Sequence, residues 1–285
     1  MHIAFFGLGN MGFPIAANLL KHGHAVTTAI HRDPTPALRL QELGAAVASS
    51  PAEALKDAEI IFTIVPNDSA LLGLLNESFL AALPTGSVVV DMTSASADAA
   101  KQAAALCASR GAALLDAPVS GGVKGAACGT MSMMCAGDRA VFDRVSPVLV
   151  EITGKLCYVG SQPGQAKIIK SLNNLLSAIN KTAVGEAWRI ADAHGVDPDA
   201  FFDAISSSSG DSFALRAAFP KIRAEDYAPG FTVALMRKDL ELAMGLADDM
   251  VLPLGEAVLD YYRRAREFDQ EDSTAVAKVR YPSRG

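Results

Sequence analysis

Lys170 and Asn174 are the two residues in this sequence whose types and spacing best suit proton transfer. They lie four positions apart in a stretch with helical periodicity, so both side chains project from the same helix face. A lysine can give a proton to an oxygen on which charge develops, and can take it back in the reverse reaction. An asparagine beside it would orient the lysine or the substrate oxygen. Both are therefore candidate catalytic and substrate-binding residues.

A second polar feature is the run Ser120, Gly121 and Gly122, which follows an apolar segment ending at Asp116. It exposes a hydroxyl group and two backbone N–H groups that no side chain obstructs. Such groups form a small concavity that binds anions. The run therefore predicts a binding site for a carboxylate, and an ordinary turn is the alternative interpretation.

The N-terminal segment could hold the phosphates of a dinucleotide. Gly7, Gly9 and Gly12 form the pattern G-x-G-x-x-G between a short apolar strand and an amphipathic helix, which is the context that the motif requires. The glycines permit a tight turn, a close approach of the backbone to a pyrophosphate at the helix N-terminus, and close packing of helix on strand. The predicted cofactor contacts here are Gly7, Leu8, Gly9, Asn10, Met11 and Gly12.

The end of the second predicted strand, residues 24–30, bears on the choice of cofactor. The residues that follow are His31, Arg32 and Asp33. At this position an acid suits the ribose hydroxyl of NAD, whereas an arginine suits the phosphate of NADP. Because Arg32 precedes the acid, the sequence favours NADP over NAD, with His31 and Arg32 as cofactor contacts. A solvated loop charge is the alternative interpretation of Arg32.

Apolar runs at 58–65, 87–91 and 112–116 predict further buried strands, and helical stretches separate them. This alternation predicts an α/β fold with a parallel, doubly wound sheet. Ligands of such sheets bind beyond the carboxyl ends of the strands. The predicted cofactor contacts at two of these ends are Val65, Pro66, Thr93 and Ser94. Helix capping is the alternative interpretation of the last two.

A long predicted helix marks the boundary between two predicted domains. Residues 163–194 show helical periodicity between the start signal Pro163–Gly164 and the stop signal Gly195. We expect residues 1–162 to form an NAD(P)-binding domain. Residues 163–285 would form an all-helical domain for substrate binding and dimerisation, with 163–194 as the interdomain helix.

Composition excludes several classes of function. The chain has 285 residues, a formal net charge of -6 and no basic run, which argues against a nucleic-acid partner. It has no apolar run of about eighteen residues, so no membrane partner is expected. The N-terminus lacks the basic region of a signal peptide. The four cysteines are scattered, which is typical of a cytoplasmic protein with reduced thiols and no metal site.

Four motifs together resemble the β-hydroxyacid dehydrogenase family, which is related to 6-phosphogluconate dehydrogenase. This is the group of 3-hydroxyisobutyrate dehydrogenase, tartronate semialdehyde reductase and glyoxylate/succinic semialdehyde reductase. The motifs are GLGNMGFPIAANL at 7–19, DAPVSGGVKGAACGT at 116–130, PGQAKIIKSLNNLLSA at 163–178 and FTVALMRKDL at 231–240. They occur in the family's order along the whole chain.

The resemblance implies a Rossmann domain joined by the long helix to an all-α C-terminal domain. It places the family's catalytic lysine at Lys170 and its partner at Asn174, and it makes Phe231 and Lys238 cofactor contacts. Lys167 also follows Gly164, but only Lys170 has an asparagine four residues later. The family's serine-glycine-glycine motif for binding substrate matches residues 120–122.

The implied activity is hydride transfer between NADP or NAD and a small carboxylate-bearing aldehyde or 2-oxo acid, which forms the hydroxy acid. The implied partner is therefore a small hydroxy or oxo acid, and no metal is implied. Two alternatives stay open: an imine reductase of the same fold, and a dinucleotide-binding module without catalytic activity. A broad apolar helical domain suggests a homodimer or a homotetramer.

Overall fold

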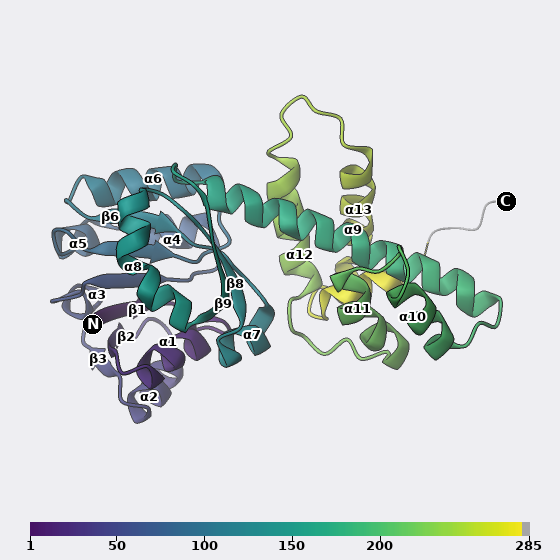
Figure 1. Cartoon of the computed structure of the whole chain (residues 1–285). Coiled ribbons are helices and arrows are strands. Elements are labelled where there is room, and N and C mark those ends of the chain that lie inside the picture. The colour runs from purple at the N-terminus through teal and green to yellow at the C-terminus, as the bar shows by residue number, and fades with distance from the viewer. Residues whose placement is uncertain (281–285) are drawn as a thin grey trace. The chain divides into compact units, whose positions relative to one another are not determined.

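A computed structural model describes residues 1–280 of the chain, which divides into two compact units (Figure 1). The first unit is Met1–Lys170 and the second begins at Ser171. The division falls within one long helix, α9 (Gln165–Ala193), so this helix contributes residues to both units. None of the helices described in residues 1–280 has the length and apolar character needed to cross a membrane.

The first unit contains a mixed sheet. Over the described residues it has nine strands in the order β3-β2-β1-β4-β5-β6-β8-β7, with β9 paired to β8. The parallel strands are β1 (His2–Phe6), β2 (Ala25–Ala29), β3 (Ala46–Ala48), β4 (Ile60–Thr63), β5 (Val88–Asp91) and β6 (Ala113–Asp116). Their order is that of dinucleotide-binding sheets, so the predicted doubly wound fold is confirmed.

The remaining strands extend the sheet beyond β6 with a change of direction. They are β7 (Val119–Ser120), β8 (Met131–Ala136) and β9 (Thr153–Gly160). Strand β8 is antiparallel to both β6 and β7, whereas β9 is parallel to β8.

Alternating apolar residues build one core on each face of the sheet. In β1, Ile3 and Phe5 point into one core, while Ala4 and Phe6 point into the other. The first core is covered by α1 (Gly12–Lys21), α2 (Thr35–Glu42), α7 (Gly122–Cys128) and α8 (Arg139–Glu151). The second is covered by α3 (Pro51–Ala54), α4 (Asp68–Leu74), α5 (Glu77–Ala81) and α6 (Ala97–Ala108). Because both faces are covered, the strand ends remain as the edge at which a ligand can bind.

The second unit is helical, as predicted. Its elements after α9 are α10 (Pro198–Ser206), α11 (Phe213–Ala224), α12 (Val233–Met244), α13 (Pro253–Arg264), and the 3-10 helices η1 (Ala265–Phe268) and η2 (Ser273–Lys278). The ring of Trp188 on α9 lies 5.4 Å from that of Phe201 and 5.2 Å from that of Phe219. Tyr262 is fully buried and donates its hydroxyl hydrogen bond to the carbonyl of Ser273 at 3.0 Å.

Helix α9 begins at the sheet for two local reasons. Gly164 has φ +95°, and a Cβ at this residue would lie 2.8 Å from the carbonyl oxygen of Ala97, so glycine is required. The Asp116 carboxylate then accepts hydrogen bonds from the backbone N–H groups of Ala166 and Lys167 at 3.0 and 3.2 Å. Asp116 thereby binds donors that would be unpaired at a helix start, where the helix dipole also favours negative charge.

Candidate active site

The carboxyl ends of four parallel strands lie next to one another at one edge of the sheet. The register of the ladder pairs Phe6 with Thr63, Thr63 with Asp91, and Asp91 with Asp116. The loops that follow β1, β4 and β5 carry most of the predicted cofactor contacts. The fold therefore brings together residues that are far apart in the sequence.

The glycine turn after β1 fits a bound pyrophosphate. A Cβ at Gly7 would lie 2.0 Å from the carbonyl oxygen of Ile64, and one at Gly12 would lie 1.8 Å from the carbonyl oxygen of Gly7. At Gly9, by contrast, a Cβ would meet nothing within 4 Å. The N-terminus of α1 has no side-chain cap and no acid in its first turn. The turn thus keeps both the space and the backbone donors that a dinucleotide needs.

The loops after β4 and β5 are tied together. The backbone N–H of Val65 donates to the hydroxyl of Thr93 at 3.1 Å, and Thr93 is fully buried. Asp68 accepts hydrogen bonds from the backbone N–H and the hydroxyl of Ser96 at 2.9 and 2.6 Å. Pro66 is exposed and Ser94 is partly exposed, so these loops still present surface at the strand ends.

In the loop after β2, the arginine and the acid have different surroundings. His31 and Arg32 are exposed. The Asp33 carboxylate accepts the backbone N–H of Thr35 at 2.9 Å at the start of α2, and this hydrogen bond lowers the pKa of Asp33. The acid is therefore engaged locally, whereas the Arg32 guanidinium is presented to solvent.

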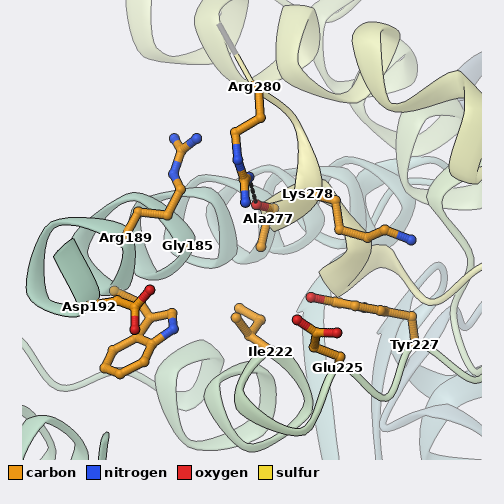
Figure 2. Close-up of a pocket in the computed structure, with 10 residues that line it drawn as sticks. Gly185, Arg189, Asp192, Ile222, Glu225, Tyr227, Ala277, Lys278 and Arg280 are labelled. Carbon is orange, nitrogen blue, oxygen red and sulfur yellow. Dashed lines mark hydrogen bonds between the residues drawn. The ribbon is translucent and has the colours of Figure 1, made fainter. Parts of the chain in front are cut away.

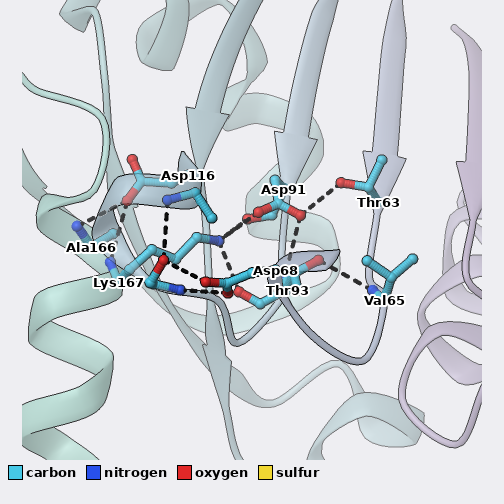
Figure 3. Close-up of polar contacts among 10 residues, drawn as sticks. Thr63, Val65, Asp68, Asp91, Thr93, Asp116, Ala166 and Lys167 are labelled. Atoms are coloured by element: carbon cyan, nitrogen blue, oxygen red, sulfur yellow. Dashed lines mark hydrogen bonds and ion pairs between the residues drawn. The ribbon is translucent and has the colours of Figure 1, made fainter. Parts of the chain in front are cut away.

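Lys167 forms a buried ion pair beneath the strand ends (Figure 3). Its Nζ donates to Oδ2 of Asp91 at 2.7 Å, to the carbonyl of Asp91 at 2.8 Å and to the carbonyl of Thr93 at 2.9 Å. The side chain of Lys167 is 1% exposed and that of Asp91 is 0% exposed. Asp91 Oδ1 accepts the hydroxyl hydrogen of Thr63 at 2.8 Å. The pair thus links α9 to two neighbouring strands.

Asp116 is the second buried acid in this region. Burial raises its pKa, and the charge of Lys167 together with the backbone N–H groups of α9 opposes that rise. One carboxylate oxygen, Oδ1, has no hydrogen-bond partner among the described residues. The sequence prediction did not include the network of Asp91, Lys167 and Asp116.

Two signals in the sequence could have revealed this network. The neighbouring buried strands VVVD and ALLD each end in an acid, and a buried acid requires a partner. Lys167 also lies on a helix stripe whose other members, Ser171, Asn174 and Ala178, are buried.

The predicted catalytic pair lies on the following turns of α9. Lys170 is partly exposed, and Asn174 is buried at 5% exposure. In the second unit, Nδ2 of Asn174 donates to Oδ2 of Asp239 at 2.6 Å, and its Oδ1 accepts Nδ2 of Asn173 at 3.1 Å. Lys238 Nζ lies 3.0 Å from Oδ1 of Asp239. Asn174 is therefore held in one orientation by an acid that the sequence did not identify as its partner.

The predicted substrate-binding turn and Phe231 lie at the ends of secondary-structure elements. Ser120 ends β7 in register with Ser132 of β8, and Gly121 and Gly122 follow with φ +138° and +63°. Both glycines are exposed, so the turn presents its backbone without side-chain cover. Phe231 precedes α12 in the second unit and is partly buried against the core of that unit.

The second unit also contains a pocket of about 320 Å³ (Figure 2). Its lining residues on α9 begin at Gly185, about 17 Å along the helix axis from Asn174 at 1.5 Å per residue. Arg189 donates to the carbonyl of Val279, and Arg280 donates to that of Ala277. These two cations are engaged by the protein itself, and the pocket does not include Asn174.

Comparisons with known proteins define the class of this site. Residues 2–160 match the family model described as the NAD binding domain of 6-phosphogluconate dehydrogenase. Residues 164–281 match the model described as NAD-binding of NADP-dependent 3-hydroxyisobutyrate dehydrogenase. The fold and the glycine turn thus belong to an oxidoreductase with a nicotinamide cofactor. The chain belongs to the β-hydroxyacid dehydrogenase family, and its activity is that of an NAD(P)-dependent dehydrogenase of this type.

Similar proteins act on different hydroxy acids. The chain is 36% identical to "Probable 3-hydroxyisobutyrate dehydrogenase" of Mycobacterium tuberculosis over 284 residues, which cover 96% of each chain. It is 35% identical to 2-(hydroxymethyl)glutarate dehydrogenase of Eubacterium barkeri, over 97% of this chain and 94% of that protein. A solved structure of Mycobacterium tuberculosis 3-hydroxyisobutyrate dehydrogenase with L-serine has a TM-score of 0.90 at 35% identity, with 97% of each chain covered.

Likeness to an imine reductase is lower. The solved imine reductase of Streptomyces aurantiacus has a TM-score of 0.67 at 28% identity, over 97% of this chain and 98% of that one. The comparisons therefore favour the dehydrogenase interpretation over the imine reductase alternative.

Alanine substitutions at two glycines of the turn should separate folding from cofactor binding. We expect Gly12→Ala to lower the melting temperature, because the new Cβ would collide with the carbonyl oxygen of Gly7. Gly9→Ala should leave the melting temperature unchanged but weaken NADPH binding about tenfold or more, because its Cβ points into open space that a pyrophosphate would fill. Thermal denaturation and cofactor titration measure both. Equal cofactor affinity in Gly9→Ala and the wild type would contradict the proposed phosphate position.

The single substitution Lys167→Met should reduce the free energy of unfolding by about 3–5 kcal/mol, because it leaves the buried Asp91 carboxylate without its counter-charge. Denaturant unfolding measures this change. Lys101→Met is the matched control, since the ion pair of Lys101 with Asp98 is exposed and its loss should cost less than about 1 kcal/mol. A loss in Lys167→Met as small as that in the control would show that the buried pair is not formed.

Proposed function

We propose that this enzyme transfers a hydride reversibly between NADP(H), in preference to NAD(H), and a small carboxylate-bearing aldehyde or 2-oxo acid. In the direction of reduction, hydride adds to the carbonyl carbon and Lys170 gives a proton to the carbonyl oxygen, so the product is the hydroxy acid. In oxidation, Lys170 takes that proton back. Lys170 is thus the general acid and base, and Asn174 orients the reacting groups.

One observation carries this proposal: the position of Lys170 on α9. It lies one helical turn after Lys167, which is bonded to the end of β5, and one turn before Asn174, which is bonded to Asp239. Lys167 is not suited to be the proton donor, because all three of its N–H groups are engaged and its side chain is 1% exposed. Lys170 is the partly exposed lysine between two fixed turns.

The substrate carboxylate would bind at the turn of Ser120, Gly121 and Gly122. The hydroxyl of Ser120 and the backbone N–H groups of the glycines are donors that suit an anion, and no side chain of the glycines blocks access. Binding the carboxylate there would restrict the motion of the carbonyl group relative to Lys170. Such positioning contributes a large part of the rate of a reaction of this kind.

The glycine turn from Gly7 to Gly12 would hold the pyrophosphate of the cofactor, and the loops after β4 and β5 would line its binding site. Residues Val65, Pro66, Thr93 and Ser94 belong to these loops. Phe231 and Lys238 are assigned to the cofactor on the family resemblance. When bound, the nicotinamide ring supplies or accepts the hydride, and the protein supplies geometry and the proton.

Lys170→Met should abolish turnover without preventing cofactor binding. We expect kcat to fall about 10²- to 10⁴-fold, because the developing charge on the carbonyl oxygen would have no proton donor. The Kd for NADPH should stay within about threefold, since the lysine does not contact the phosphates. Steady-state kinetics and fluorescence titration measure these quantities, with the exposed Lys155→Met as control. A Lys170→Met enzyme with full turnover would refute the assigned role.

Arg32→Ala should change the cofactor preference. We expect the KM for NADPH to rise about 10- to 100-fold, the range for losing charged hydrogen bonds to a phosphate, while the KM for NADH stays within about threefold. Arg32→Lys, which retains the charge, should fall between the wild type and Arg32→Ala. Kinetics with each cofactor measure the ratio. If Arg32→Ala changed both KM values equally, Arg32 would not read the ribose phosphate.

A further inference from the structure

The role of Lys167 is not explained by stability alone. Burying a lysine costs free energy unless its charge is paired and its N–H groups are bound, and Lys167 meets both conditions with three acceptors within 2.9 Å. Even so, apolar residues of similar volume often replace a buried ion pair with no loss of stability. The ion pair between Lys167 and Asp91 therefore suggests a requirement for a defined geometry.

The acceptors of Lys167 belong to the segment that the proposed function assigns to the cofactor. The carbonyl and carboxylate of Asp91 are at the end of β5, and the carbonyl of Thr93 is in the loop after it. The hydroxyl of Thr93 in turn accepts the backbone N–H of Val65 in the loop after β4. One ammonium group is thus connected to both loops, as Figure 3 shows.

Lys167, which donates these hydrogen bonds, lies on α9, the helix that also carries Lys170, the proposed proton donor. Lys170 follows Lys167 by three residues, about 4.5 Å along the helix axis. Because α9 is continuous from Gln165, any rotation or shift of its first turn is passed on to Lys170. Asp116 binds the backbone of the same turn but is not bonded to the loop of Thr93 in the described structure. The ammonium group of Lys167 bonds directly to that loop, at the carbonyl of Thr93.

We propose that Lys167 is a positioning residue that sets the place of Lys170 relative to the cofactor loop Thr93–Ser94. The residue itself contacts neither substrate nor cofactor. Its ammonium group holds the helix and the loop in one register, so that the proton donor and the bound cofactor face the same carbonyl group. This inference rests on the proposed function of Lys170.

The test variant is the double substitution Asp91→Asn and Lys167→Met. It removes both charges of the Lys167–Asp91 pair together, so neither partner is left behind as an unpaired charge, while Asp116 keeps its hydrogen bonds from the backbone of α9. The protein should therefore fold. Oδ1 of the new asparagine can still accept the hydroxyl hydrogen of Thr63, as Asp91 Oδ1 does. The matched control is Lys181→Met, because Lys181 is a partly buried lysine further along α9 that donates to the hydroxyl of Ser273 at 2.8 Å.

Kinetic constants distinguish positioning from stability. In the folded double variant we expect kcat to fall about 100-fold, the effect of a small misplacement of reacting groups. The KM for the cofactor should stay within about threefold. The deuterium isotope effect measured with deuterated NADPH should rise, because hydride transfer becomes slower than the other steps. Lys181→Met should change neither kcat nor the isotope effect. A double variant with the kcat and isotope effect of the wild type would overturn the proposal.

A second measurement keeps this inference separate from the proposed function. The fluorescence of NADPH bound at saturation reports the surroundings of the nicotinamide ring and needs no turnover. We expect an altered emission in the double variant and an unaltered one in Lys181→Met. If the wild type turned over none of the substrates tested, the proposed function would fail, and the emission would then decide the role of Lys167. Emission identical to that of the wild type would overturn that role.

Discussion

The ammonium group of Lys167 is the constraint on which the arrangement of the first unit's strand ends and α9 depends. It enters the protein interior with all three N–H groups bonded to the end of β5 and the loop beyond. Asp116, at the end of β6, accepts hydrogen bonds from two backbone N–H groups in the first turn of the same helix. These contacts determine where α9 begins, and the helix then carries Lys170 and Asn174 on its next turns. A glycine at residue 164 is required because the helix starts so close to α6.

The sequence predicted the fold well where the signals are local. Proline and glycine at 163 and 164, and glycine at 195, predicted a helix at 163–194, and the observed helix is Gln165–Ala193. The apolar run 87–91 became β5 (Val88–Asp91) because both faces of a doubly wound sheet are buried. The antiparallel pairing of β8 with β6 and β7 could not be predicted in this way. Pairing direction depends on the path of the chain between strands, which no short pattern encodes.

In the candidate site, too, local features were predictable from the sequence and long-range contacts were not. The glycine turn was predictable because its motif is a short continuous stretch, in which Gly7 has a positive φ and Gly12 packs against the carbonyl of Gly7. The partners of Lys167 and Asn174 were not, because Asp91 is 76 residues from Lys167 and Asp239 is 65 residues from Asn174. Long-range pairs of this kind are visible in a sequence only as charged residues on an otherwise buried stripe. The reaction class follows from the family, while the roles that we propose for Lys167 and Asn174 are argued from these contacts.

The most direct measurement is a substrate and cofactor survey of the wild-type enzyme by nicotinamide absorbance. Oxidation would be assayed with 3-hydroxyisobutyrate, 2-(hydroxymethyl)glutarate and L-serine, and reduction with glyoxylate and the semialdehydes of succinate, tartronate and methylmalonate. Each would be tested with both cofactors, and a cyclic imine would be included. The account predicts turnover of at least one carboxylate-bearing substrate, with a higher kcat/KM for NADP(H) than for NAD(H). Tight cofactor binding with no turnover of these acids, or turnover of the imine alone, would contradict it.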